Sequence, residues 1–148
     1  MLTKIRNSAL NLLAQREHTQ LELQRKLIAK GFAVDDVIKA IHELEKQGLQ
    51  SNERFTESYI AMRTKRGFGP IRIKMELYER GVEQELIERF LLGYKSAWPE
   101  LAEKARCKKF GKKIPNDLSE QAKQMRYLYH KGFDTDLIRR ILRSEFET

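Results

Sequence analysis

The histidines of this sequence are the side chains best suited by type to acid–base catalysis or metal binding at neutral pH. His18, His42 and His130 lie far apart along the chain. His42 is followed by Glu43, as in the helix of zinc peptidases, but the second histidine of that pattern would fall at position 46, which is Lys46. We therefore expect all three histidines on exposed helix surfaces, and we predict no catalytic residue, no metal site and no cofactor.

A glycine-rich stretch, Gly67 to Pro70, follows Lys65 and Arg66 and could in principle cradle a phosphate. It lacks the Gly-Lys-Ser/Thr ending of a nucleotide-binding loop, and no predicted strand precedes it. We interpret it as a turn between two helices, and the backbone NH groups beyond Pro70 offer a weaker anion site. The single cysteine, Cys107, excludes an internal disulfide and a cysteine-based zinc cage, and we expect it half-buried on a helix.

Basic residues form two runs that contain no acidic residue. The first run holds Arg63, Lys65, Arg66, Arg72 and Lys74, and the second holds Lys104, Arg106, Lys108, Lys109, Lys112 and Lys113. Any single lysine is best explained as part of a solvated helix surface. Because like charges in one block repel each other, the runs as groups indicate a surface that binds an anionic partner, either nucleic acid or an acidic protein. The formal net charge of +8 supports this prediction.

Helical periodicity covers almost the whole chain and predicts nine helices and no strand. Thr19 and Glu22 have the spacing of a capping box, and Asp117 and Glu120 repeat it. Pro70 suits the first turn of a helix, where its missing NH has no partner to lose. The composition, 41% hydrophobic and 34% charged, is that of a globular protein with no membrane-spanning or signal segment, so we expect a cytoplasmic location.

Three glycines, Gly31, Gly81 and Gly132, lie 50 and 51 residues apart and each follows a basic residue. Similar apolar positions precede and follow each glycine, which indicates an internal repeat. We predict three three-helix repeats, 1–50, 51–97 and 98–148, each resembling a helix-turn-helix unit. Small units of this kind stack to share their cores, so the predicted fold is an elongated all-α tandem array. Trp98, at the start of the third repeat, is the predicted packing anchor between repeats.

The second repeat carries a pattern that resembles the RecX family of regulatory proteins. The matching residues are Arg54, Phe55, Tyr59, Arg63, Gly67, Gly69, Pro70, Ile73, Leu77 and Gly81, and the resemblance extends through Trp98 to Gly111 and to the triple repeat. One departure is that Ser51 and Asn52 stand where the family usually has acidic residues. The resemblance implies a non-enzymatic, monomeric protein that binds RecA filaments on DNA, inhibits RecA and so regulates recombination, DNA repair and the SOS response.

Two other hypotheses remain beside this one. Three-helix units with short turns also occur in proteins that bind DNA directly, so the chain could bind single- or double-stranded DNA without RecA. A helical scaffold with no nucleic acid is the third hypothesis, and it leaves the two basic runs unexplained.

Overall fold

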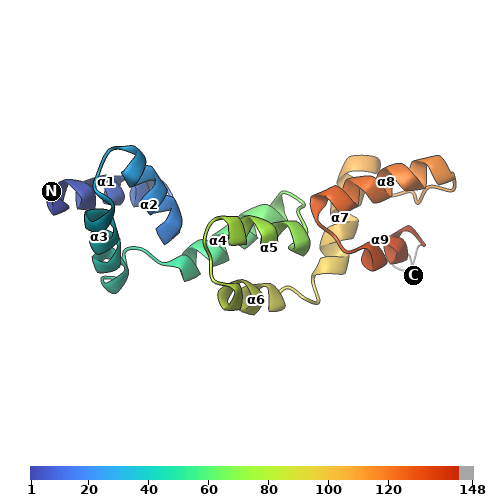
Figure 1. Ribbon diagram of the computed structural model, residues 1–148. Helices are drawn as coiled ribbons and strands as arrows, with labels where there is room; N and C mark the ends of the chain where they lie inside the picture. Colours follow the sequence, from blue (N-terminus) through green and yellow to red (C-terminus); the bar gives the residue numbers. More distant parts are fainter. Residues whose placement is uncertain (144–148) are drawn as a thin grey trace. The chain divides into compact units, whose positions relative to one another are not determined.

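The computed structural model describes residues 1–143, and within this range the chain forms nine α-helices and no strand (Figure 1). The helices are α1 (Leu2–Gln15), α2 (Gln20–Ala29), α3 (Val34–Lys46), α4 (Asn52–Lys65), α5 (Pro70–Glu79), α6 (Gln84–Leu92), α7 (Trp98–Phe110), α8 (Leu118–Lys131) and α9 (Thr135–Leu142). The predicted all-α class and the number of helices are confirmed for these residues. Residues 144–148 of the predicted third repeat lie outside the described residues.

Several helix ends follow the predicted capping chemistry. Thr19 and Glu22 form a reciprocal capping box at the start of α2, where the threonine hydroxyl accepts from the backbone nitrogen of Glu22 at 3.0 Å. The Asp117 carboxylate accepts from two backbone NH groups at the start of α8. Gly132 ends α8 in the left-handed region, with φ of 101°, where a residue without Cβ avoids a steric cost. Local sequence therefore fixes where these helices begin and end.

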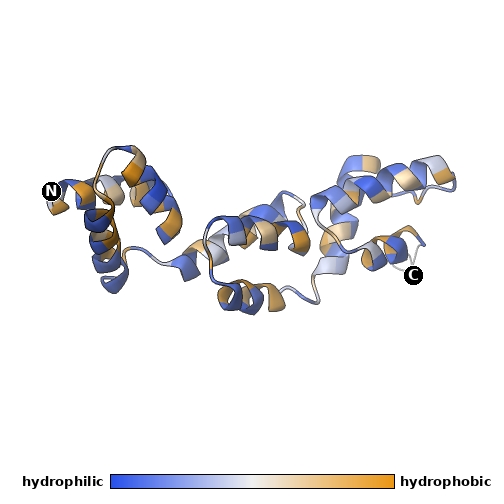
Figure 2. Ribbon diagram, in the orientation of Figure 1, coloured by the Kyte–Doolittle hydropathy of each residue, from blue (hydrophilic) through white to orange (hydrophobic). Residues whose placement is uncertain are grey.

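The first three helices contact one another and enclose a common apolar core. Its buried members are Ile5, Ala9, Leu23, Leu27, Val37, Ala40, Ile41 and Leu44. Figure 2 shows apolar and polar residues alternating along each helix, as expected when one side of a helix faces a core. Burial of the valine, leucine and isoleucine side chains among them, at about 1.5–3 kcal/mol each, is the main source of stability here.

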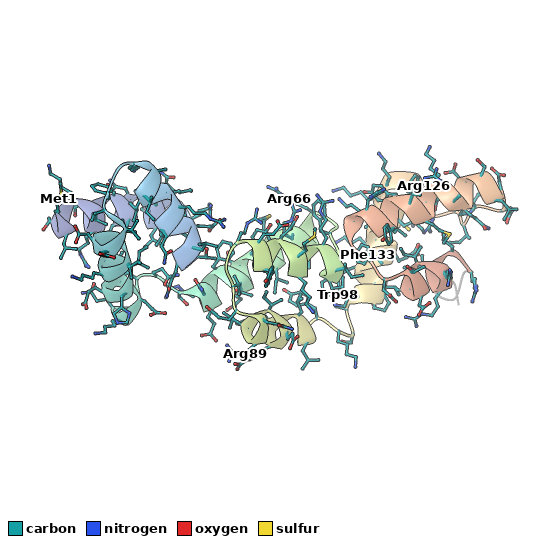
Figure 3. All side chains as sticks on the ribbon, viewed as in Figure 1. Met1, Arg66, Arg89, Trp98, Arg126 and Phe133 are labelled. Atoms are coloured by element: carbon teal, nitrogen blue, oxygen red, sulfur yellow. The ribbon has the colours of Figure 1, made fainter. Side chains whose placement is uncertain are left out.

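The last three helices, α7, α8 and α9, also contact one another. Trp98 is 8% exposed, and its ring meets that of Phe133 edge to face, with centroids 6.4 Å apart. Figure 3 labels both residues where α7 approaches the chain after α8. Tyr94, which precedes α7, stacks on Trp98 at 5.6 Å. Trp98 therefore packs as an anchor for the connection into α7.

The chain divides into two compact units, one of Met1–Tyr59 with Leu77–Ile87 and one of Ile60–Glu76 with Glu88–Thr148. Helices α4, α5 and α6 each contribute residues to both units. The three repeat boundaries and the elongated shape therefore stay predictions.

One expectation about the histidines is wrong. His18 lies between α1 and α2 rather than on a helix, and only 1% of its surface is exposed. His42 and His130 are exposed on helices, as expected. Both ring nitrogens of the buried His18 have partners, because Nδ1 bonds the Arg16 carbonyl at 3.0 Å and Nε2 bonds the Lys26 ammonium at 2.9 Å.

Candidate binding surface

The glycine-rich turn before α5 makes a close backbone contact with the end of α8. The Gly69 nitrogen donates to the Lys131 carbonyl at 2.7 Å, and the Ile71 nitrogen donates to the Gly132 carbonyl at 3.0 Å. A Cβ added to Gly69 would lie 2.6 Å from the Gly132 oxygen, and one added to Gly132 would lie 2.5 Å from the Arg72 Cβ. We call this contact, formed by Gly69–Arg72 with Lys131 and Gly132, the second joint, because a similar contact earlier in the chain is the first joint described below.

The second joint bears on the two interpretations of the glycine-rich stretch. The first NH beyond Pro70, that of Ile71, is taken up by a carbonyl of the α8 end, and the Ile73 nitrogen bonds the Gly69 carbonyl. Two of the NH groups on which the weaker hypothesis depends are therefore bonded within the protein, and an anion at the start of α5 stays a prediction. The turn interpretation is confirmed. Gly69 is needed because two backbone segments touch there, and Gly67 because its φ of 85° lies in the left-handed region.

The Phe68 ring is surrounded by three cations. The guanidinium carbons of Arg63 and Arg72 lie 3.6 and 4.6 Å from its centroid, and the Lys131 ammonium lies 3.7 Å from it. Each such contact is worth about 0.5–2 kcal/mol, more when it is sheltered from water. Phe68 therefore helps to hold α4, α5 and the end of α8 together.

Two of the predicted binding arginines are also held by a carboxylate. Arg63 forms two hydrogen bonds with Glu76, of 2.8 and 2.7 Å, and both side chains are only 13% exposed. Arg72 bonds the same carboxylate at 3.3 Å and the His130 carbonyl at 3.0 Å. These contacts give Arg63 and Arg72 a structural role at the second joint. Their part in partner binding stays a prediction.

Lys131 is a cation of this region that sequence reasoning did not single out. Its ammonium donates to the Arg66 carbonyl at 3.2 Å. Burial lowers the pKa of Lys131, and the positive charges of Arg72, Arg63 and Lys108 lower it further. The sequence pattern that could have identified Lys131 is its position directly before a repeat glycine, which Lys30 and Arg80 occupy in the other repeats.

Arg106, a third predicted binding residue, lies inside the protein. Its side chain is fully buried and forms an ion pair with Glu103. It also donates to the carbonyls of Gly111, Lys112 and Lys113, at 3.4, 3.0 and 3.2 Å. A buried guanidinium with this many acceptors ties the α7–α8 connection to α7.

The neighbouring thiol of Cys107 is half-buried, as predicted, and both its burial and Glu103 raise its pKa.

The remaining predicted cations are exposed, namely Lys65, Arg66, Lys74, Lys104, Lys108, Lys109, Lys112 and Lys113. Figure 3 shows the Arg66 side chain projecting from the region of α4 and α5. Four of them, Lys65, Arg66, Lys104 and Lys108, line a hollow of about 280 Å³ together with Thr64, Gly67, Leu101, Ala105 and Tyr127. We call this cavity the basic hollow. The structure brings the two basic runs together there.

A second contact of the same type lies at the start of α2. The Thr19 hydroxyl donates to the Arg80 carbonyl at 2.6 Å, and a Cβ added to Gly81 would lie 2.6 Å from the Leu21 Cβ. We call this contact, formed by Thr19 and Leu21 with Arg80 and Gly81, the first joint. Around it, the Asn52 amide nitrogen donates to Glu83, and the Asn52 amide oxygen accepts from the Gln20 backbone nitrogen.

Within residues 1–143, no three His, Cys, Asp or Glu side chains lie close enough to hold a metal ion. In the same range, every helix is too short or too polar to cross a membrane.

Comparison with known proteins gives a consistent result along the chain. Residues 6–44, 51–91 and 99–142 match the family models described as the first, second and third three-helix domains of RecX. A protein named Regulatory protein RecX from Legionella pneumophila is 40% identical over 142 residues, covering 96% of this chain and 95% of the relative. One of the same name from Pseudomonas syringae pv. tomato is 38% identical over 138 residues, covering 93% and 89%.

A solved structure supports the fold. The crystal structure of RecX from Lactobacillus salivarius superposes with a TM-score of 0.77, covering 96% of this chain and 94% of that one. The two sequences are 24% identical, so this likeness concerns the arrangement of helices alone.

Proposed function

Since the chain belongs to the RecX family, we propose that it binds RecA filaments on DNA and lowers the ATP hydrolysis and strand exchange of RecA. The observation that carries this proposal is the match to all three RecX domains, in order, over most of the chain. A regulator of this type acts as a monomer in the cytoplasm, without a cofactor, wherever RecA meets DNA.

The exposed cations support the proposal physically. A RecA filament on DNA presents phosphates and acidic side chains, and complementary charge increases the rate and specificity of association. Three exposed members of the second basic run, Lys109, Lys112 and Lys113, lie at the end of α7 and in the connection that follows it. We propose that these residues, with Lys65, Arg66, Lys74, Lys104 and Lys108, contribute to the filament-binding surface. An array of stacked repeats, if elongated as predicted, suits a filament groove.

The first experiment is a titration of RecA ATP hydrolysis on single-stranded DNA. We expect the rate to fall as the protein is added. An unchanged rate over a wide range of protein concentrations would contradict the proposal.

A charge-reversal variant tests the surface. We expect Lys109→Glu, Lys112→Glu and Lys113→Glu together to raise the half-inhibitory concentration about tenfold, because three exposed contacts of about 0.5 kcal/mol each are lost. Lys4→Glu, Lys30→Glu and Lys39→Glu together are the matched control, with the same change of charge on exposed residues of the first repeat. If both variants inhibited RecA with the same half-inhibitory concentration, the end of α7 would not be part of the binding surface. Arg72 is unsuitable for this test, because its reversal would place a second carboxylate beside Glu76.

A further inference from the structure

The basic hollow has two walls that carry different parts of its charge. One wall is the end of α4, with Lys65 and the following Arg66. The other is one face of α7, because Leu101, Lys104, Ala105 and Lys108 follow the helical spacing of three and four residues. Two cations thus come from each wall.

No acidic side chain lines the hollow. In the described part of the chain, its four cations are also without an ion pair to a carboxylate, unlike Arg63, Arg72 and Arg106. Four unneutralised charges around one cavity repel one another, and an anion that enters it relieves this repulsion. The hollow is therefore built for an anion.

The spacing of the cations bears on which anion fits. Lys104 and Lys108 are four residues apart on one helix, which places their backbones about 6 Å apart along its axis. The neighbouring phosphates of a triphosphate share one bridging oxygen and are closer than this. Successive phosphates of a nucleic-acid strand are separated by a sugar and match the longer spacing better.

An aromatic ring completes the lining of the hollow. Tyr127, from α8, is half-buried there, and its ring is braced by an edge-to-face contact with Phe110, with centroids 5.2 Å apart. Aromatic rings beside cations are the usual means by which proteins hold the unstacked bases of a single strand. A volume of about 280 Å³ is near the lower limit of small-ligand pockets, so there is room for about one nucleotide.

We propose that the basic hollow binds a nucleotide of single-stranded nucleic acid, with successive phosphates on Lys104 and Lys108 and the base against Tyr127. Lys65 and Arg66 contact the strand from the opposite wall. This binding requires no RecA, and it goes beyond the proposed function without depending on it.

The test uses the full-length protein without RecA and a fluorescein-labelled 15-nucleotide oligothymidylate, with affinity measured by fluorescence anisotropy at several salt concentrations. Each phosphate contact on a single strand contributes about 0.7 to the slope of log affinity against log salt. We expect Lys104→Gln with Lys108→Gln to lower that slope by about 1.4. The control, Lys4→Gln with Lys39→Gln, removes the same charge from the first repeat and should keep the wild-type slope.

The base contact has its own variant. Tyr127→Leu should weaken binding of the oligonucleotide roughly 5- to 150-fold, the range for loss of one stacked base, whereas Tyr127→Phe should bind like wild type. Thermal unfolding of both variants shows whether the contact with Phe110 survives. If Tyr127→Leu does not fold, the lysine variants still decide the question.

Three outcomes would overturn the proposal. The first is an unchanged salt slope in the Lys104 and Lys108 variant. The second is that a duplex of the same length binds the wild-type protein as tightly as the single strand does, and that both lose the same affinity in the Lys104 and Lys108 variant. The third is that inorganic triphosphate displaces the strand at a concentration equal to the dissociation constant of triphosphate for the protein. This result would mean that the hollow binds free polyphosphates. None of these bears on RecA inhibition, which is measured separately, so the two proposals can fail independently.

Discussion

The two joints make the same connection with different chemical groups. In each, residues at the start of a repeat's second helix meet the basic residue and the glycine that end the second helix of the following repeat. Thr19 and Gly69 are equivalent positions, each twelve residues before its repeat glycine. At the first joint the hydroxyl of Thr19 donates to the Arg80 carbonyl, and at the second joint the backbone NH of Gly69 donates to the Lys131 carbonyl.

The difference shows two solutions to one requirement. The last carbonyls of a helix need donors from outside the helix, and a neighbouring helix start can supply them. A side-chain donor leaves space between the two backbones, whereas a backbone donor brings them together and excludes a Cβ. The second joint therefore depends on Gly69 and Gly132, where a Cβ would meet backbone, and the first on the Thr19 hydroxyl and on Gly81, where a Cβ would meet the Leu21 side chain.

The largest expected effect comes from alanine at the three repeat glycines. Gly31, Gly81 and Gly132 share positive φ angles of 98°, 83° and 101°. An added Cβ would meet nothing at Gly31, the Leu21 side chain at Gly81 and the Arg72 backbone at Gly132. We expect Gly132→Ala to lower the free energy of unfolding by about 2–5 kcal/mol, the sum of backbone strain and overpacking.

Gly31→Ala is the matched control, since it introduces the backbone strain alone and should cost about 1 kcal/mol. We expect the loss of free energy of unfolding in Gly81→Ala to lie between those of Gly31→Ala and Gly132→Ala. Urea unfolding of the three variants measures the series. Equal losses would show that the glycines serve only as helix caps and not as joints.

The next effect concerns the donor of the first joint. Thr19 is fully buried, and its hydroxyl both caps α2 and donates to Arg80. We expect Thr19→Val to cost about 2–3 kcal/mol, because a helix cap is lost and a carbonyl loses its donor. Thr19→Ser keeps the hydroxyl and should cost less than about 1 kcal/mol. If serine were as damaging as valine in thermal unfolding, packing of the methyl group would outweigh the hydrogen bond.

A smaller effect is expected at Phe68. Phe68→Leu keeps an apolar side chain and removes the ring that faces Arg63, Arg72 and Lys131. We expect a loss of about 1–2 kcal/mol, because Arg63 and Arg72 keep their bonds to Glu76. Phe68→Tyr is the control that retains the ring. Chemical denaturation compares the two variants, and an equal loss in both would mean that the ring contributes by its shape alone.

The smallest expected effect is a pH dependence of stability caused by His18, the residue before Thr19 of the first joint. His18 occupies the position equivalent to Phe68, and burial lowers its pKa below the ordinary 6.5, with the charges of Arg16 and Lys26 adding to this effect. Because the unfolded chain takes up this proton at a higher pH than the folded protein, stability is complete above about 6.5 and falls as the pH decreases below it. Melting temperatures between pH 7.5 and 5 should show this fall.

His18→Gln is the matched control, because glutamine can still accept from Lys26 but does not titrate. We expect this variant to lose much of the dependence in that pH range. The pKa of Glu22 is also lowered from 4.5, chiefly by its hydrogen bonds to Arg16 and Thr19 against the opposing effect of burial, so its contribution is lost only under more acidic conditions. A His18→Gln protein with the wild-type pH profile would contradict the assignment.

Local sequence was enough to predict most of the helices. The capping box at Thr19, the proline at the start of α5 and the cap at Gly132 are determined within a few residues, so their patterns are visible in the chain. The three-fold recurrence of glycine identified the repeat for the same reason. Helix α3 lacks such a signal, because its N-cap is Ala33, without a side-chain hydrogen bond, and its acidic residues Asp35 and Asp36 lie in its first turn.

The candidate surface was only partly predictable, because burial depends on contacts between distant residues. Both basic runs contribute to one hollow, yet Arg106 lies inside the protein although its neighbours in the run are exposed. Nothing in a run of cations distinguishes the one that is buried. The joints were missed for a related reason, since Thr19 and Arg80 are 61 residues apart. Only alignment of the repeats, which sets Thr19 against Gly69, would have suggested the contact.

The buried guanidinium of Arg106 has a consequence for digestion by trypsin. Lys112 and Lys113 are exposed in a connection between helices, the type of segment that proteases usually cut first. A protease must draw an extended backbone into its active site, and here three successive carbonyls would first have to leave Arg106. Limited digestion should therefore spare this connection in the native protein, and should cut it early in Arg106→Gln, so that the pattern of fragments reports on a contact hidden from solvent.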